Sequence, residues 1–154
     1  RPIREALAGS ALGEAVAVVD LVVDASDNFA TRHAVNRACV QYGKPLVSGA
    51  AIGFSGQLAV FDSRRANSPC YHCLFPEHAD EPELRCAEAG VFSPLVGVIG
   101  AMQAMEALKY LAQVGEPLIG RLLLWDGLRA DARVMKVPRD PACPVCGQTA
   151  SQAG

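Results

Sequence analysis

The chain has 154 residues, of which 51% are hydrophobic and 19% are charged, and its formal net charge is −2. This length is typical of one domain that can bury its own core. The composition disfavours a disordered chain and a basic nucleic-acid surface, so we expect no nucleic acid as a partner. The longest apolar stretch, residues 91–105, is shorter than the roughly 20 residues of a membrane-spanning helix. It predicts a buried helix, and we expect no membrane partner.

The first half of the sequence predicts a strand, a helix and two further strands. The apolar run within residues 15–26 is typical of a strand buried on both faces. Apolar residues at helical spacing predict a helix over residues 28–42, and Gly43 supplies a stop signal. Residues 45–50 and 57–61 predict two more strands around a glycine-punctuated turn. The order strand, helix, strand indicates a parallel pair with a crossover, as in doubly wound α/β domains.

The second half begins with a long connection and ends in a hairpin. Residues 68–90 show no periodicity and are too many for an unstructured connection without a function or a staple. Ser93 is typical of an N-cap, and we expect a helix from there to about Gln113. Its polar stripe comprises Gln103, Glu106, Tyr110 and Gln113. Residues 121–126 and 133–137 predict two strands of a hairpin. We expect residues 1–147 to form one domain and residues 148–154 a flexible tail.

Two Cys-x-x-Cys pairs are the strongest chemical signal. Residues 1–14 lack the apolar core of a secretory signal, so we expect a cytoplasmic location. In that compartment cysteines serve metal binding or catalysis more often than disulfides. Four thiolates with two-residue gaps are typical of a closed, tetrahedral, structural zinc site. A redox dithiol or two disulfides are the alternatives. The four cysteines are Cys70, Cys73, Cys143 and Cys146.

A polar cluster, Asp24-Ala25-Ser26-Asp27-Asn28, lies where the first strand ends and the first helix begins. In open α/β sheets ligands bind beyond the carboxyl ends of strands, and a carboxylate there can hold Mg²⁺ on a nucleotide triphosphate. The alternative is that Ser26 or Asp27 caps the helix.

The remaining cysteines and histidines carry weaker signals. Cys86 lies beside Arg85 and shortly before a helix, which favours a reactive thiolate, although an inert loop cysteine is equally consistent with the sequence. Cys39 is on the apolar face of the first helix and is expected in the core. The histidines, His33, His72 and His78, are scattered, and we expect His72 to lie next to the zinc ligands or on the surface. Neither a dinucleotide-binding nor a P-loop glycine motif occurs in these 154 residues.

Seven segments together resemble the ThiF/MoeB/HesA family, the bacterial relatives of ubiquitin-activating enzymes, in order and spacing. They are Asp24-Ala-Ser-Asp-Asn-Phe-Ala-Thr-Arg32, Gly53-Phe-Ser-Gly-Gln57, Cys70-x-x-Cys73, Arg85-Cys-Ala-Glu-Ala-Gly90, the helix start at Ser93, Trp125-Asp-Gly127 and Cys143-Pro-Val-Cys146-Gly. The resemblance covers about residues 15–147. It implies an α/β fold, the C-terminal part of a Rossmann-like mixed sheet with flanking helices and a structural zinc site of four cysteines.

The resemblance also implies an activity, namely ATP-dependent adenylation of the C-terminal Gly-Gly of a ubiquitin-like sulfur-carrier protein in thiamin or molybdopterin biosynthesis. It assigns Asp27 to Mg²⁺ and ATP, with Asn28 and Arg32 in support, and the four paired cysteines to Zn²⁺. Cys86 becomes the loop thiol of acyl or sulfur transfer.

The resemblance further implies a homodimer and a sulfurtransferase as partner. The family's glycine-rich nucleotide loop precedes the matching segment, and we expect the chain to lack it. The alternative is a zinc-stabilised docking module without catalysis that binds a carrier protein or a sister subunit.

Overall fold

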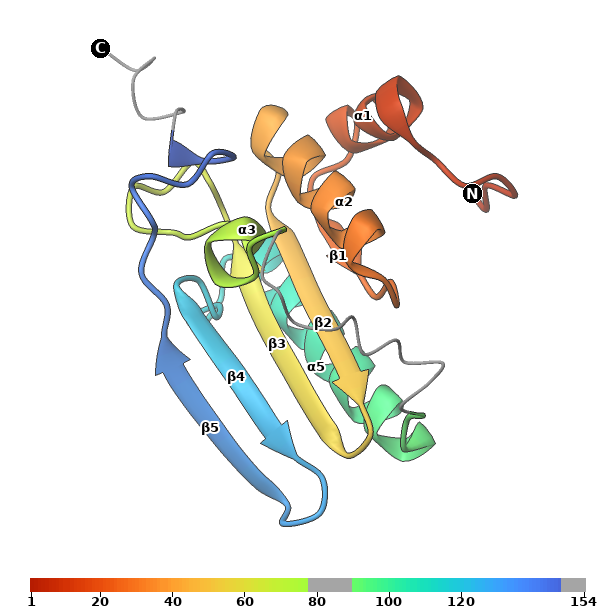
Figure 1. The fold of residues 1–154 in the computed structure, drawn as a ribbon, viewed down its shortest axis with the longest axis vertical. Helices are drawn as coiled ribbons and strands as arrows, with labels where there is room; N and C mark the ends of the chain where they lie inside the picture. The colour runs from red at the N-terminus through yellow and green to blue at the C-terminus, as the bar shows by residue number, and fades with distance from the viewer. Residues whose placement is uncertain (78–89, 148–154) are drawn as a thin grey trace.

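A computed structural model describes residues 1–77 and 90–147. Its centre is a five-stranded mixed sheet with the order β1-β2-β3-β4-β5 (Figure 1). β1 and β2 are parallel, and each later strand is antiparallel to the one before it. The strands are β1 (Val22–Asp24), β2 (Leu46–Ile52), β3 (Ser55–Phe61), β4 (Arg121–Asp126) and β5 (Asp131–Lys136). The predicted α/β class, the parallel pair and the late hairpin are confirmed.

The helix α2 (Phe29–Gln41) forms the crossover between β1 and β2. It begins after Asn28, and it ends before Gly43, whose φ of 60° lies in the left-handed region that glycine adopts without strain. β1 ends at Asp24, which is in register with Ser48 of β2. Because the two strands are parallel, the end of β1 lies beside the second half of β2. The crossover therefore brings the polar cluster at residues 24–28 beside the carboxyl end of β2.

The first strand is much shorter than the apolar run predicted, and the expectation of a strand buried on both faces is wrong. The start of that run belongs to the helix α1 (Gly9–Ala17) instead, in which Gly13 and Val16 are buried at a helical spacing. β1 pairs only with β2 among the described strands, and the side chain of Val23 is 49% exposed. A short apolar run fits either a strand or one face of a helix, and periodicity alone does not separate them.

Helices cover both faces of the sheet. α2 and the short α3 (Tyr71–Leu74) pack on one face, where Leu46, Ala59 and Phe61 meet Val35, Cys39 and Tyr71. α5 (Ser93–Ala112) crosses the other face behind β2 and β3 (Figure 1). A Cβ at Gly56 would lie 2.6 Å from Ile99 Cδ1, so glycine at this position of β3 allows α5 to approach closely.

α5 is only half buried, and the expectation that residues 91–105 form a buried helix is wrong. Its buried residues are Leu95, Ile99, Gln103 and Glu106. Two residues of the predicted polar stripe, Gln103 and Glu106, thus face the protein, while Gln113 is exposed. Met105 (56% exposed) and Leu108 (65%) face outward. Phe92, not Ser93, is the N-cap residue. By length and a mean hydropathy of 1.2 alone, α5 could span a membrane. A helix that packs on a sheet can have the same composition.

Candidate functional site

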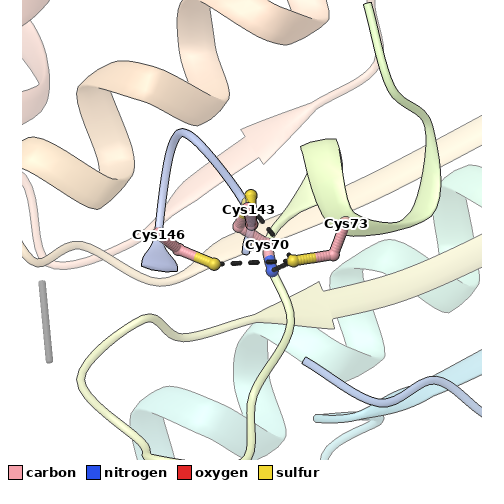
Figure 2. Close-up of side chains that lie close together, drawn as sticks. All are labelled: Cys70, Cys73, Cys143 and Cys146. Carbon is pink, nitrogen blue, oxygen red and sulfur yellow. Dashed lines mark hydrogen bonds between the residues drawn. The ribbon is translucent and has the colours of Figure 1, made fainter. Parts of the chain in front are cut away.

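The four paired cysteines form one cluster, as predicted. Cys70 precedes α3 and Cys73 lies in it, while Cys143 and Cys146 come from a turn after β5. The Sγ atoms of Cys70 and Cys73 are 3.9 Å apart, those of Cys70 and Cys143 are 3.7 Å apart, and those of Cys73 and Cys146 are 3.5 Å apart. Figure 2 shows the sulfurs turned toward one another. Residues far apart in the sequence thus meet at one point.

These distances fit a tetrahedral ion and do not fit disulfides. Four sulfurs about 2.3 Å from a central Zn²⁺ lie about 3.8 Å from each other, whereas a disulfide brings two sulfurs to about 2.05 Å. None of the four cysteines is in a disulfide. The alternative of two disulfides is therefore not what the structure shows. The four-sulfur set has no open position, so an ion here would be structural.

The charge balance of the cluster also favours a cation. The hydrogen bond from Cys70 lowers the pKa of Cys73 to about 4, so one thiolate is stable with the protein's own groups. Burial raises the pKa of Cys146 to about 12, and a hydrogen bond with Cys73 together with burial raises that of Cys70. Further thiolates at this position need a positive charge among them, which a divalent ion supplies.

Neighbouring groups hold the cluster in place. Asn36, which is 1% exposed, donates from Nδ2 to Cys70 Sγ at 3.6 Å and accepts the Tyr71 N–H at 2.9 Å. The Cys143 carbonyl accepts the Gly147 N–H at 2.8 Å. A Cβ at Gly147 would lie 2.7 Å from the Pro141 carbonyl oxygen, so this turn requires glycine. The glycine after the second pair therefore has a steric role beside the cysteine cluster.

A second site lies where β1 and β2 end. A cavity of about 230 Å³ is lined there by residues from the polar cluster, from β2 and from the N-terminal half of α5. Asp27 is exposed at its rim, and the buried Arg32 donates to the carbonyls of Ser26 and of Gly49, the latter at 3.3 Å. The structure thus brings Asp27 and Arg32 to one cavity. Asn28 lies beside it and caps α2.

Two further residues of this site, Gln103 and Asp24, were given no individual role in the sequence analysis. Gln103 of α5 lines the cavity and donates from Nε2 to the carbonyl of Asp24 at 2.8 Å. Asp24 is 4% exposed; its Oδ1 accepts from Ser26 N and Oγ, while its Oδ2 is buried without a hydrogen-bond partner among the described residues. A polar residue in the middle of an otherwise apolar helix is a signal that could have assigned Gln103 to the site from the sequence.

The remaining predicted residues fall into three groups. Cys86 and His78 lie outside the described residues, so the loop thiol stays a prediction. Cys39 is 2% exposed, and burial raises its pKa to about 12, which confirms a core cysteine. The expectation that the histidines are scattered is wrong for His33 and His72, whose ring centroids are 5.6 Å apart. α2 and α3 pack together there, which the sequence separation of the two residues conceals.

Comparison with known proteins places these sites in context. The sequence pattern of the ThiF family matches residues 1–145. The sulfur carrier protein adenylyltransferase of Thermus thermophilus is 53% identical over 137 residues, which cover 86% of this chain and 51% of that protein. The molybdopterin-synthase adenylyltransferase of Salmonella typhimurium is 45% identical over 150 residues, covering 96% and 58%. The chain therefore spans about half the length of the curated relatives it matches.

The fold has counterparts among solved structures. The crystal structure of E. coli MccB with ATP superposes with a TM-score of 0.66 at 21% sequence identity, covering 83% of this chain and 39% of that one. At this identity the likeness supports the arrangement of strands and helices alone.

Proposed function

The chain belongs to the ThiF family, and on that premise we propose that it forms part of an ATP-dependent adenylyltransferase acting on a ubiquitin-like sulfur-carrier protein. In this reaction a C-terminal carboxylate oxygen of the carrier's Gly-Gly attacks the α-phosphorus of ATP. The bond to the β,γ-phosphates breaks, and the products are an acyl-adenylate and pyrophosphate. The names of both relatives described above support this class of reaction.

The cavity at the ends of β1 and β2 carries the proposal. It holds an exposed carboxylate, Asp27, at the edge of the sheet where open α/β domains bind ligands. A carboxylate there is a suitable ligand for Mg²⁺, which neutralises phosphate charge as pyrophosphate leaves. In the proposal Asp27 holds Mg²⁺ and ATP, Arg32 fixes the loop that carries Asp27, and Asn28 fixes the start of α2.

The other predicted components complete the proposal. The four paired cysteines hold a structural Zn²⁺, and Cys86 acts as a thiol in acyl or sulfur transfer. Phosphate binding by a glycine-rich loop is assigned to polypeptide outside these 154 residues. The carrier protein, a sulfurtransferase and a second copy of the chain are the proposed partners. A sedimentation mass of one chain at micromolar concentration would contradict the homodimer.

The test is ATP–pyrophosphate exchange by a chimera. The part of the Thermus thermophilus relative that this chain does not match is fused to this chain, and exchange is measured with Mg²⁺ and a carrier ending in Gly-Gly. We expect exchange that depends on the carrier and falls at least about a hundredfold in Asp27→Asn, because the variant loses the metal's anionic ligand. The complete relative is the positive control, and this chain alone should give no exchange.

Two outcomes would overturn the proposal. A folded chimera that binds ATP and the carrier yet gives no exchange would favour the alternative, a docking module without catalysis. Exchange that Asp27→Asn leaves unchanged would remove Asp27 from the site. Exchange by this chain alone would instead show that it binds the phosphates itself.

A further inference from the structure

A second group of metal-ligating side chains lies between α2 and α3, on neither of the sites described above. One imidazole nitrogen of His33, one of His72 and a carboxylate oxygen of Glu77 lie within 4.8 Å of one another. His33 comes from α2, His72 from α3, and Glu77 follows α3 by three residues. Two imidazoles and one carboxylate are the protein ligands of many open transition-metal sites.

The two histidines have unused coordination capacity. His33 is 3% exposed, and its Nδ1 is buried without a hydrogen-bond partner in the described part of the chain. The Nδ1 of His72 is in the same condition. A buried polar atom without a partner is unfavourable, so two such atoms in adjacent rings require an explanation. A bound ion that takes a nitrogen of each ring as a ligand would explain them.

Packing holds His33 in position before any ion binds. Its ring meets Tyr71 edge to face at a centroid distance of 5.2 Å and His72 at 5.6 Å. Burial lowers the pKa of His33, although the charge of Glu77 opposes this change, so the imidazole is neutral at pH 7. A neutral imidazole is the form that binds metals.

Arg37 prepares the carboxylate. It donates to Glu77 Oε1, and this hydrogen bond lowers the pKa of Glu77. The carboxylate is therefore ionised, and no described residue donates a hydrogen bond to its Oε2. Hydrogen bonds of this kind orient the carboxylate ligands of metal sites.

We propose that His33, His72 and Glu77 form a second metal site that takes a divalent ion of the zinc class and keeps one coordination position for water. The site is distinct from the cysteine cluster, because His72 lies between Cys70 and Cys73 and an α-helix turns successive side chains by about 100°. The inference does not depend on the proposed adenylation.

The experiment counts metal ions on the untagged, reduced, metal-free chain. Co²⁺ is added stepwise while the absorbance is recorded, and bound Zn²⁺ is counted separately after gel filtration. The first ion should enter the cysteines with a thiolate–cobalt charge-transfer band. The second should bind without increasing that band, so the wild type holds two ions. Glu77→Gln and His33→Asn should each hold one ion and weaken binding of the second at least about tenfold.

Two controls separate the site from a general effect. Asp131→Asn removes another carboxylate that is paired with an arginine, Arg133, and it should retain two ions. Because His33 is buried, its variant could fail to fold, but Glu77 is at the surface and Glu77→Gln leaves the core untouched. Retention of the thiolate band by Glu77→Gln shows that the cysteine site is intact. A wild type that binds only one ion, or a Glu77→Gln variant that binds the second ion as tightly, would overturn the proposal.

Discussion

Asn28 determines where α2 starts. Its Oδ1 accepts the N–H of Thr31 at 2.8 Å, which satisfies one of the backbone donors that the first helical turn leaves free. Its Nδ2 also donates to Asp27 Oδ1 at 3.2 Å. The same residue therefore ends the polar cluster, caps the helix and orients the carboxylate proposed to bind Mg²⁺.

Asn28→Ala should lower the free energy of unfolding by about 1 kcal/mol, because the Thr31 N–H loses its acceptor. Asn28→Ser should retain most of the stability, since a serine oxygen also caps helices well. Urea denaturation of the three proteins at one pH measures the difference. An alanine variant as stable as the wild type, or a serine variant as unstable as the alanine one, would contradict the role of the cap.

The polar cluster also marks the limit of prediction from sequence at this scale. The five residues of the cluster indicated either a ligand site or a helix cap at Ser26 or Asp27. A cavity lies there, and the cap is Asn28 instead. Which residue caps depends on local dihedral angles: Asn28 is extended, with φ −139° and ψ 147°, and the helix starts at the next residue. Ser26 instead donates to Asp24. Sequence places several competent side chains side by side and does not rank them.

Among the elements, α5 departs most from expectation. Its buried face carries Gln103 and Glu106, because the chain beneath it offers backbone groups that need partners. Gln103 donates to the carbonyls of Asp24 and Val47, and Glu106 accepts the Leu118 N–H at 2.8 Å. A Cβ at Gly49 would lie 2.4 Å from Gln103 Cδ, so the glycine in β2 makes room for this amide.

Gln103→Leu should destabilise the chain by about 1–3 kcal/mol even though it makes the buried face more apolar. The carbonyl of Asp24 would lose its side-chain donor in a buried position. The matched control is Leu108→Gln on the outward face of α5, which should change stability by no more than about 0.5 kcal/mol. Chemical denaturation of both variants decides the matter. If Leu108→Gln lowered the stability more than Gln103→Leu, apolar contacts alone would hold α5.

Hydrophobic periodicity predicted the extent of α5 but not which of its faces is buried. It ranks the faces of an element by their apolar content, and it contains no information about what lies opposite. The hairpin of β4 and β5 was predictable because Asp126-Gly127 marks a turn, whatever packs around it. Local turn chemistry was therefore a better guide than burial in this chain.

Across the whole molecule, the cysteine cluster joins segments that are far apart in sequence. Residues 74–142 separate its two pairs, yet the four sulfurs lie within 4.8 Å of one another. The sequence predicted this meeting because Cys-x-x-Cys spacing is typical of metal sites. His33 and His72 also come close, but no sequence pattern links them, so their proximity became apparent only in the structure. Long-range contacts were predictable only where a motif encodes them.

Cys143→Ala should lower the melting temperature of the zinc-loaded chain by about 6–12 °C. The last described segment would lose its attachment to α3, and structural zinc binding contributes directly to folding. A loss of about 3 kcal/mol or more corresponds to this shift for a domain of this size.

Calorimetry with and without a chelator measures the effect. The chelator should lower the melting temperature of the wild type by a similar amount and that of Cys143→Ala by much less. Cys39→Ala, which removes a cysteine outside the cluster, should stay sensitive to chelator. A wild-type melting temperature that does not respond to the chelator would show that packing of the cysteines, without an ion, holds the last described segment to α3.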